Sequence, residues 1–483
     1  MRARAVCVAA IVAMTAVLAA RPDLQPPPFA KAPAGQPSPI DGVLAPWDKK
    51  DSPGCALGVF KDGAIAYRRG YGMASLEHDA PITADTVFYA GSVSKQFTAM
   101  AAALAIKQGK LAYDDPIRKY LPELPPYADA IKVRHLLHHT SGLRDYNTLL
   151  SIAGRRDEDA WDNRVVLQMT AKQTRLNFKP GDEYLYSNTG YTLLATIVER
   201  ATGQPFAAFA DANIFKPLGM DVTHYHVDAG RLVHHRALAY GGREGQWTLD
   251  TPINERAGAG GLYTNIPDLL KWDENFYTGR VGGPDVLKQL QTPGTLNDRK
   301  SLAYAWGLQI GEYRGLPIVE HSGSLGGYRA HIIRFPAQHT SVALLCNASA
   351  IAPTTLARRV ADVVLANTLT GPAPTPAIAG GRGGGTAEIP PPAAMPAGRS
   401  LADYAGTYES GEVDGTFIVT VDGIELMLRR ETDAEPAVMQ QGFAADEFRA
   451  RGLVIRFQRA ASKTVTALTV DAGRVRDIKF TKR

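Results

Sequence analysis

One segment of this chain cannot form part of a folded core, and it divides the sequence in two. Residues 371–400 contain seven Gly, seven Pro and seven Ala, a composition that buries too little apolar surface to offset the entropy lost on folding. An earlier segment, residues 22–39, contains seven Pro. About 330 residues lie between the two segments and about 85 follow the second. Because a single core rarely exceeds about 250–300 residues, we predict two folded domains joined by a linker.

The first twenty residues have the pattern of a secretory signal. Arg2 and Arg4 precede an apolar run from Ala5 to Leu18, and the small residues Ala19 and Ala20 follow. The run is short for a membrane-spanning helix of about 20 residues, although an uncleaved membrane anchor is the alternative. We therefore expect export to the periplasm or outside the cell. The predicted organisation is a signal peptide at 1–20, a Pro-rich linker at 21–40, a first domain at 41–370, a linker at 371–398 and a second domain at 399–483.

Composition excludes several classes of protein. With 45% hydrophobic and 21% charged residues, and a formal net charge of +5, the chain is neither disordered nor a basic nucleic-acid binder, since its Lys and Arg residues are scattered. Cys55 and Cys346 both lie in apolar runs. They are either buried free thiols or one disulfide.

Strand patterns occur at both ends of the first domain. Residues 56–60 and 64–69 form a hairpin pattern, and further strands are expected at 303–310, 328–335 and 341–345. Between them, residues 94–107 have helical spacing and end before Gly109. This order predicts one sheet closed by the two ends of the domain, an inserted helical cluster, and a site in the cleft between them.

The second domain has the alternation of short strands. Phe417, Val419 and Val421 precede a turn at Asp422-Gly423, and further inward residues are expected to be Ile424, Leu426, Leu428, Leu453, Ile455, Phe457, Leu468, Val470, Ile478 and Phe480. This spacing is typical of a small barrel or sandwich.

Three short motifs indicate chemistry. Ser92 and Lys95 form the only Ser-x-x-Lys of the chain, and at a helix start this spacing places an amine beside a hydroxyl that it can activate, near free backbone amides. The alternative is an N-cap serine followed by a surface lysine. Tyr-x-Asn occurs as Tyr186-Ser187-Asn188 and as Tyr263-Thr264-Asn265. Either tyrosine, held as a phenolate near a lysine, can act as a general base, and spacing does not choose between them.

The third motif is His321-Ser322-Gly323, the only His-x-Gly of the chain. A hydrogen-bonding or cationic ring beside a glycine, which lets backbone approach closely, suits the docking of a carboxylate or carbonyl group.

In this order the motifs resemble those of the serine β-lactamase and penicillin-binding-protein superfamily. The surrounding sequence is similar to the class C β-lactamase-related branch, with its esterases and D-amino-acid-directed peptidases, at residues 88–98, 133–143, 180–191 and 260–272. The second domain, from Leu401 to Tyr408 onward, resembles a lipocalin-like barrel appended to some of these enzymes. The resemblance implies an α/β (α+β) β-lactamase-like domain, with an antiparallel sheet flanked by helices and a helical subdomain, followed by a small all-β barrel.

The resemblance also implies roles for individual residues. Ser92 is the acylated nucleophile, and Lys95 with Tyr186, rather than Tyr263, forms the base system. The substrate-binding residues are Asn188, His321, Ser322, Gly323 and Ser324, with the N–H groups of Ser92 and Ser324 as the oxyanion hole. Many β-lactamases have Lys-Thr-Gly where this chain has His321-Ser322-Gly323. The His form resembles D-alanyl-D-alanine carboxypeptidases, D-aminopeptidases and esterases.

The resulting hypothesis is a serine hydrolase for an ester, a D-amino-acid-containing peptide or a related amide, which includes cell-wall peptide. It needs no metal or cofactor and no nucleic acid. The alternatives are a true β-lactamase, or a silent penicillin-binding or signalling domain. A metal-dependent alternative rests on His224, His226 and Asp228, but Ala229 stands where a metallo-β-lactamase pattern has a further His. No Gly-x-Ser-x-Gly is present, which argues against an α/β-hydrolase elbow.

Overall fold

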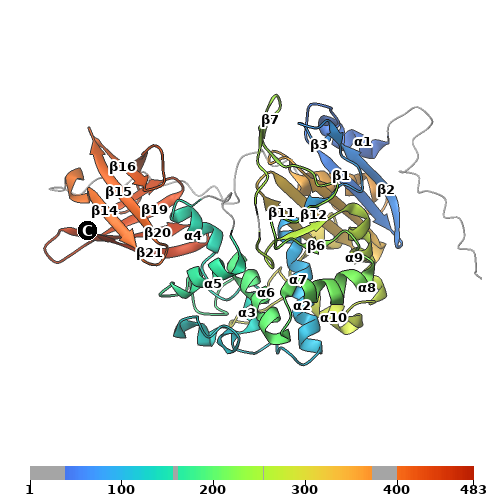
Figure 1. The fold of residues 1–483 in the computed structure, drawn as a ribbon, viewed down its shortest axis with the longest axis horizontal. Coiled ribbons are helices and arrows are strands. Elements are labelled where there is room, and N and C mark those ends of the chain that lie inside the picture. Colours follow the sequence, from blue (N-terminus) through green and yellow to red (C-terminus); the bar gives the residue numbers. More distant parts are fainter. Residues whose placement is uncertain (1–37, 156–160, 254, 373–399) are drawn as a thin grey trace, which may run out of the picture.

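The computed structural model describes residues 38–155, 161–253, 255–372 and 400–483, which form a mixed α/β domain and a β-barrel (Figure 1). The predicted signal peptide, and nearly all of both predicted linkers, lie outside the described residues. Among the helices that are described, none is both long enough and apolar enough to cross a membrane.

A six-stranded antiparallel sheet is the centre of the first domain. Its strand order is β10-β11-β12-β13-β1-β2. The strands are β1 (Cys55–Lys61), β2 (Ala64–Tyr71), β10 (Gln309–Tyr313), β11 (Leu316–Leu325), β12 (Tyr328–Phe335) and β13 (Thr340–Cys346). β1 pairs with β13, with Val59 opposite Val342. The prediction that the two ends of the domain close one sheet is therefore confirmed.

Helices cover both faces of this sheet, because successive side chains of a strand point to opposite faces. On β1, Leu57 and Val59 pack into an apolar cluster with α1 (Pro39–Leu44) and α11 (Pro353–Val364). Ala56 and Phe60 join the opposite cluster with α2 (Ser94–Lys107) and α9 (Ile266–Thr278). The central strands β1 and β13 are consequently continuous apolar runs rather than alternating sequences.

A helical subdomain fills the chain between β2 and β10. Its remaining helices are α3 (Val133–Leu137), α4 (Tyr146–Ile152), α5 (Asn163–Ala171), α6 (Asn188–Thr202), α7 (Phe206–Ala210), α8 (Lys216–Leu218) and α10 (Gly283–Leu290). The short strands here are β3 (Met73–Ser75), β4 (Ala80–Pro81), β5 (Phe88–Tyr89), β6 (His224–Tyr225), β7 (Tyr240–Arg243), β8 (Gln246–Leu249) and β9 (Leu262–Thr264). Helix α2 is buried from Ser94 to Ala105, and its run of alanines lets neighbouring elements approach closely.

One strand prediction was wrong. Residues 303–308 form a loop that is buried from Tyr304 to Leu308, and β10 begins only at Gln309. The apolar spacing that suggested a strand comes from burial against the helical subdomain, where Ala305 and Trp306 lie. The Trp306 ring stacks on Tyr113 with ring centroids 5.3 Å apart.

The second domain is a closed barrel of eight strands in sequence order. They are β14 (Gly406–Ser410), β15 (Gly415–Asp422), β16 (Glu425–Arg430), β17 (Ala437–Gln441), β18 (Glu447–Ala450), β19 (Leu453–Arg459), β20 (Val465–Ala472) and β21 (Val475–Lys482). The predicted inward residues are buried except Val421 and Ile424, which are 40% and 92% exposed. Val421 lies near the end of β15, opposite Leu426, and Ile424 lies in the turn between β15 and β16, where the hairpin extends into solvent.

The barrel packs against α4 and α5, as Figure 1 shows. Leu149, Leu150 and Val166 share one buried apolar cluster with the aromatic core of the barrel. A buried ion pair joins the two parts, with Arg144 Nη1 2.5 Å from Glu412 Oε2. Arg144 also donates to the carbonyl oxygens of Arg476 and Asp477. The barrel is thus fixed by polar as well as apolar contacts.

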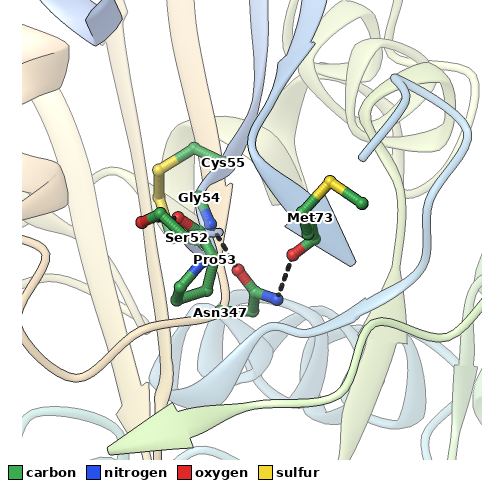
Figure 2. Close-up of a disulfide and its surroundings, with 7 residues drawn as sticks. Ser52, Pro53, Gly54, Cys55, Met73 and Asn347 are labelled. Atoms are coloured by element: carbon green, nitrogen blue, oxygen red, sulfur yellow. Dashed lines mark hydrogen bonds between the residues drawn. A yellow bond between two sulfur atoms is a disulfide. The ribbon is translucent and has the colours of Figure 1, made fainter. Parts of the chain in front are cut away.

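Cys55 and Cys346 form a disulfide between directly paired residues of β1 and β13 (Figure 2). The sequence left this open between a disulfide and free thiols. Beside it, the buried Asn347 accepts from the Gly54 N–H at 2.8 Å and donates to the Met73 carbonyl at 2.9 Å. Side-chain and covalent links therefore hold this end of the sheet together.

Candidate active site

The structure brings Ser92 and Lys95 together at the start of α2. A 3₁₀ turn at Gly91–Val93 leads into the helix, so residues three apart lie on one face. Lys95 Nζ lies 2.9 Å from Ser92 Oγ, 2.9 Å from Asn188 Oδ1 and 2.8 Å from the Ala259 carbonyl oxygen. Asn188 Oδ1 and the Ala259 oxygen can only accept. A neutral amine has two N–H donors for them and one lone pair left, which matches the hydroxyl proton of Ser92.

Burial favours this neutral form of Lys95. The side chain is completely buried, and desolvation moves its pKa well below the ordinary value, although Asp145 opposes the shift. The Arg474 guanidinium adds to the lowering. Geometry therefore places the amine beside the Ser92 hydroxyl, and burial favours the form that can accept its proton.

Tyr186 and Asn188 reach the same place from the start of α6. Lys95 Nζ lies 4.8 Å from the centroid of the Tyr186 ring. Burial raises the pKa of Tyr186 above its ordinary value, although the Ser92 hydroxyl and Arg474 oppose it. The phenol is thus protonated at neutral pH, unlike the phenolate that the sequence suggested, and can donate a proton.

The second Tyr-x-Asn lies elsewhere. Tyr263 is buried on β9, where its ring stacks on His224 with centroids 5.9 Å apart. Asn265 caps α9 by accepting from the Asp268 N–H at 3.0 Å. This copy is therefore part of the core and of a helix end.

The motif on β11 faces the turn that carries Ser92. Gly91 has a φ of +55°, and a Cβ on it would lie 2.4 Å from the Ser324 nitrogen. A Cβ on Gly323 would lie 2.0 Å from the Ala90 oxygen and 3.0 Å from the Ser92 nitrogen. Two glycines thus permit the close approach of the Ser92 and Ser324 backbones, and both residues line one cavity.

His321 lies beside this cavity as a neutral ring. Its Nδ1 is 2.6 Å from the Ser322 carbonyl oxygen and its Nε2 is 3.1 Å from the Tyr304 hydroxyl. Burial, with Lys95 nearby, lowers the pKa of His321 to about 3. With Nδ1 donating and Nε2 accepting, the ring is oriented by the protein and carries no charge.

A cavity of about 540 Å³ joins these groups. It lies between the sheet edge and the helical subdomain, where the sequence led us to expect a site. Its lining includes Ser92, Tyr186, Asn188, His321, Ser322, Gly323 and Ser324, together with Tyr184, Arg256 and Arg474.

Three residues at the site were missed by the motif reading. His139 packs on Tyr186 with ring centroids 4.1 Å apart, and its Nδ1 accepts from the Ser187 N–H at 3.1 Å. Asp145 accepts from the Asn188 N–H at 2.6 Å. His139 lies within the segment 133–143 that carries the family resemblance, whereas Arg474 belongs to the barrel and had no signal in the sequence.

Of the histidine pair, His224 belongs to β6 and His226 follows the strand directly. His224 Nδ1 lies 2.9 Å from the Val222 carbonyl oxygen, and Asp228 Oδ1 accepts from the Gly230 N–H. Within the described ranges, no group of three or more His, Cys, Asp or Glu side chains is placed to hold a metal ion.

The chain belongs to the β-lactamase family. The family model named Beta-lactamase matches residues 40–366.

Named relatives have several activities. A D-aminopeptidase of Gluconobacter oxydans is 31% identical over 302 residues, which cover 61% of this chain and 56% of the relative. Penicillin-binding protein 4* of Bacillus subtilis is 29% identical over 300 residues, 59% of this chain and 66% of the relative. The chain thus spans only about half to two thirds of the length of these curated relatives.

Solved structures show the same fold. An octameric penicillin-binding protein homologue from Pyrococcus abyssi has a TM-score of 0.60 at 23% identity and covers 92% of this chain and 98% of its own. A D-amino acid amidase from Ochrobactrum anthropi, solved with D-phenylalanine, has a TM-score of 0.59 at 23% identity over 68% of this chain and 98% of its own.

Proposed function

We propose that this protein is an exported serine hydrolase that cleaves an ester or amide, of the D-amino-acid peptide type, through a covalent acyl-enzyme at Ser92. The observation that carries the proposal is the set of three contacts around Lys95 Nζ. They place the amine beside the Ser92 hydroxyl, and burial favours the neutral form, whose lone pair can take the Ser92 proton. The name of the D-aminopeptidase relative supports D-amino-acid substrates.

The proposed acylation uses groups that are already in place. The Ser92 proton moves to Lys95 Nζ while Oγ bonds to the substrate carbonyl carbon, and the carbonyl oxygen receives the displaced electron pair. The N–H groups of Ser92 and Ser324 stabilise that oxygen. As the bond to the leaving group breaks, Tyr186 donates its phenolic proton to the leaving group and regains one from Lys95. Water then attacks the acyl-enzyme by the reverse proton route and releases the acid.

An oxidising compartment fits the disulfide. Bonds such as Cys55–Cys346 persist in the periplasm or outside the cell and are rare in the reducing cytosol. The charged and apolar pattern of residues 1–20 agrees with export.

Covalent labelling tests the proposal. A neutral fluorophosphonate or a fluorescent penicillin is expected to add one label per chain, located by peptide mass spectrometry at Ser92. Ser92→Ala is expected to remove the label, and Ser301→Ala, at an exposed serine, to keep it. An unlabelled wild-type protein, or equal labelling of Ser92→Ala, would contradict the proposed nucleophile.

A further inference from the structure

The cavity beside Ser92 has an unbalanced set of charges. Arg256 and Arg474 line it, and none of its described lining residues is acidic. His321 is neutral there, since burial lowers its pKa to about 3. The wall of the cavity is therefore cationic.

Arg474 comes from the barrel rather than from the domain that holds the serine. It lies at the tip of the β20–β21 hairpin, between Ala472 and Val475. Asn177 clamps this tip from the other domain, because its Nδ2 donates to the Arg474 carbonyl and its Oδ1 accepts from the Arg476 N–H, both at 2.9 Å.

Further contacts fix the same tip. The Arg476 guanidinium forms a forked ion pair with Glu183, at 3.1 and 2.9 Å. Arg144, from the first domain, donates to the Arg476 and Asp477 carbonyl oxygens. The backbone that carries Arg474 is thus held on both sides, so its guanidinium is positioned before any substrate arrives.

The Arg474 side chain keeps donors for a ligand. Its guanidinium carbon lies 4.7 Å from the centroid of the Tyr186 ring, and the side chain is 43% exposed. Asp145 is the nearest acid at 3.9 Å, which is too long for a hydrogen bond, and its own oxygens accept from the Asn188 and Thr148 amides. Burial of Asp145, at 1% side-chain exposure, keeps it from facing the cavity.

We infer that Arg474 is a specificity residue that binds a carboxylate of the substrate, so that the barrel completes the active site. The inference rests on the proposed function and narrows it to esters and amides that carry a carboxylate. A guanidinium pairs with a carboxylate through two parallel hydrogen bonds. A substrate with a free ammonium group beside the scissile bond meets two guanidinium groups, and none of the described residues that line the cavity is acidic, so this site disfavours an aminopeptidase substrate.

Matched substrates test this. Mono-p-nitrophenyl glutarate, p-nitrophenyl pentanoate and p-nitrophenyl 4-trimethylammoniobutanoate place a negative, neutral or positive end on the acyl side. N-acetyl-D-alanyl-D-lactate and its methyl ester vary the charge on the leaving side. Wild-type kcat/KM is expected to favour the anionic member of at least one set, and Arg474→Ala to reduce that preference roughly 10- to 100-fold. Arg474→Lys is expected to restore part of it and Arg474→Glu to favour the cation.

Controls separate specificity from folding. Arg449→Ala removes a barrel arginine that is also about half exposed, at 46%, and that also lies over a ring, that of Phe443 at 4.3 Å. It is expected to leave every ratio unchanged. An equal loss on neutral and anionic substrates in Arg474→Ala, or an unchanged preference, would overturn the inference.

The neutral fluorophosphonate distinguishes the two proposals. If Ser92 is labelled at similar rates in wild type and in Arg474→Ala, the nucleophile works without the arginine. The substrate experiments then test only the proposed role of Arg474. If wild type is not labelled at all, it is the proposed function that fails.

Discussion

Lys95 is the residue whose environment decides the pH dependence of this site. Burial lowers its pKa well below the ordinary value, while burial raises that of Tyr186. The working form has a neutral amine and a neutral phenol. As pH falls, Lys95 gains a proton and can no longer accept one from Ser92.

We expect kcat/KM on a neutral ester to rise from acid pH to a plateau that includes neutrality. The loss on the alkaline side should begin only above the ordinary tyrosine pKa of about 10. Since Arg474 helps to lower the pKa of Lys95, Arg474→Ala should move the acid limb to higher pH. A pH–rate profile of both proteins checks this, and an acid limb that moves to lower pH would contradict the electrostatic account.

Gly323 determines whether the two backbone amides can face one cavity. In Gly323→Ala, the new Cβ would meet the Ala90 oxygen at 2.0 Å, so β11 must move away from the turn that carries Ser92. Loss of one oxyanion donor costs about 10²- to 10³-fold in kcat. We expect a loss of that size, measured on p-nitrophenyl pentanoate, with the protein still folded by circular dichroism.

Gly42→Ala is the matched control for this substitution, because nothing lies within 4 Å of its new Cβ on α1. It should leave kcat unchanged. A normal kcat in Gly323→Ala would show that the amide of Ser324 does not stabilise the oxyanion.

At the scale of elements, the contact between barrel and helices depends on the Arg144–Glu412 pair. Removing one partner of a buried ion pair costs about 3–5 kcal/mol, and Arg144 is 1% exposed. Arg144→Met should therefore lower the thermal midpoint clearly, whereas Arg164→Ala, at a side chain that is 79% exposed, should change stability by less than about 1 kcal/mol.

The pair also has a pH dependence. Despite the cost of burial, hydrogen bonds from Thr174 and the charge of Arg144 hold the pKa of Glu412 below its ordinary value. Its stabilisation is therefore present above the ordinary glutamate pKa of about 4.3 and is lost as pH falls through the lowered value. The difference in thermal midpoint between wild type and Arg144→Met should shrink below about pH 4. A difference that stays constant down to pH 3 would rule out the ion pair as its source.

The elements that the sequence predicted are those whose local pattern matches their tertiary role. The β1–β2 hairpin and α2 were predicted because their sequences have regular spacing and clear ends. The pairing of both ends of the sheet was predicted because strand patterns occur at both ends of the domain. The segment 303–308 failed because burial against helices produces the same apolar spacing as a strand. Ser92 and Lys95 came from a motif, whereas Tyr186 was chosen over Tyr263 by the family resemblance. Arg474 could not be predicted from the sequence, because nothing local distinguishes one arginine in a hairpin turn. It reaches the cavity only because the barrel packs against the first domain.

At the scale of the whole molecule, the disulfide links residues 291 positions apart. A cross-link that closes so long a loop typically stabilises a protein by about 2–5 kcal/mol, through the unfolded chain. Cys55→Ala/Cys346→Ala should lower the midpoint of guanidinium unfolding, and reductant should lower that of wild type but not of the double variant. Equal midpoints for oxidised wild type and the double variant would show that the bond does not stabilise the fold.

The pairing of β1 with β13 also sets the order in which the chain can fold. β1 and β2 meet across a two-residue turn and can form as soon as both are made. The pairing of β1 with β13, in the middle of the sheet, cannot be completed before residue 346 is present, since Cys55 lies opposite Cys346. Contacts of such high sequence separation make folding slow. In a chain that emerges N-terminus first, the residues of the helical subdomain are therefore present before the sheet can be completed, and Ser92 meets Ser324 only when β11 arrives.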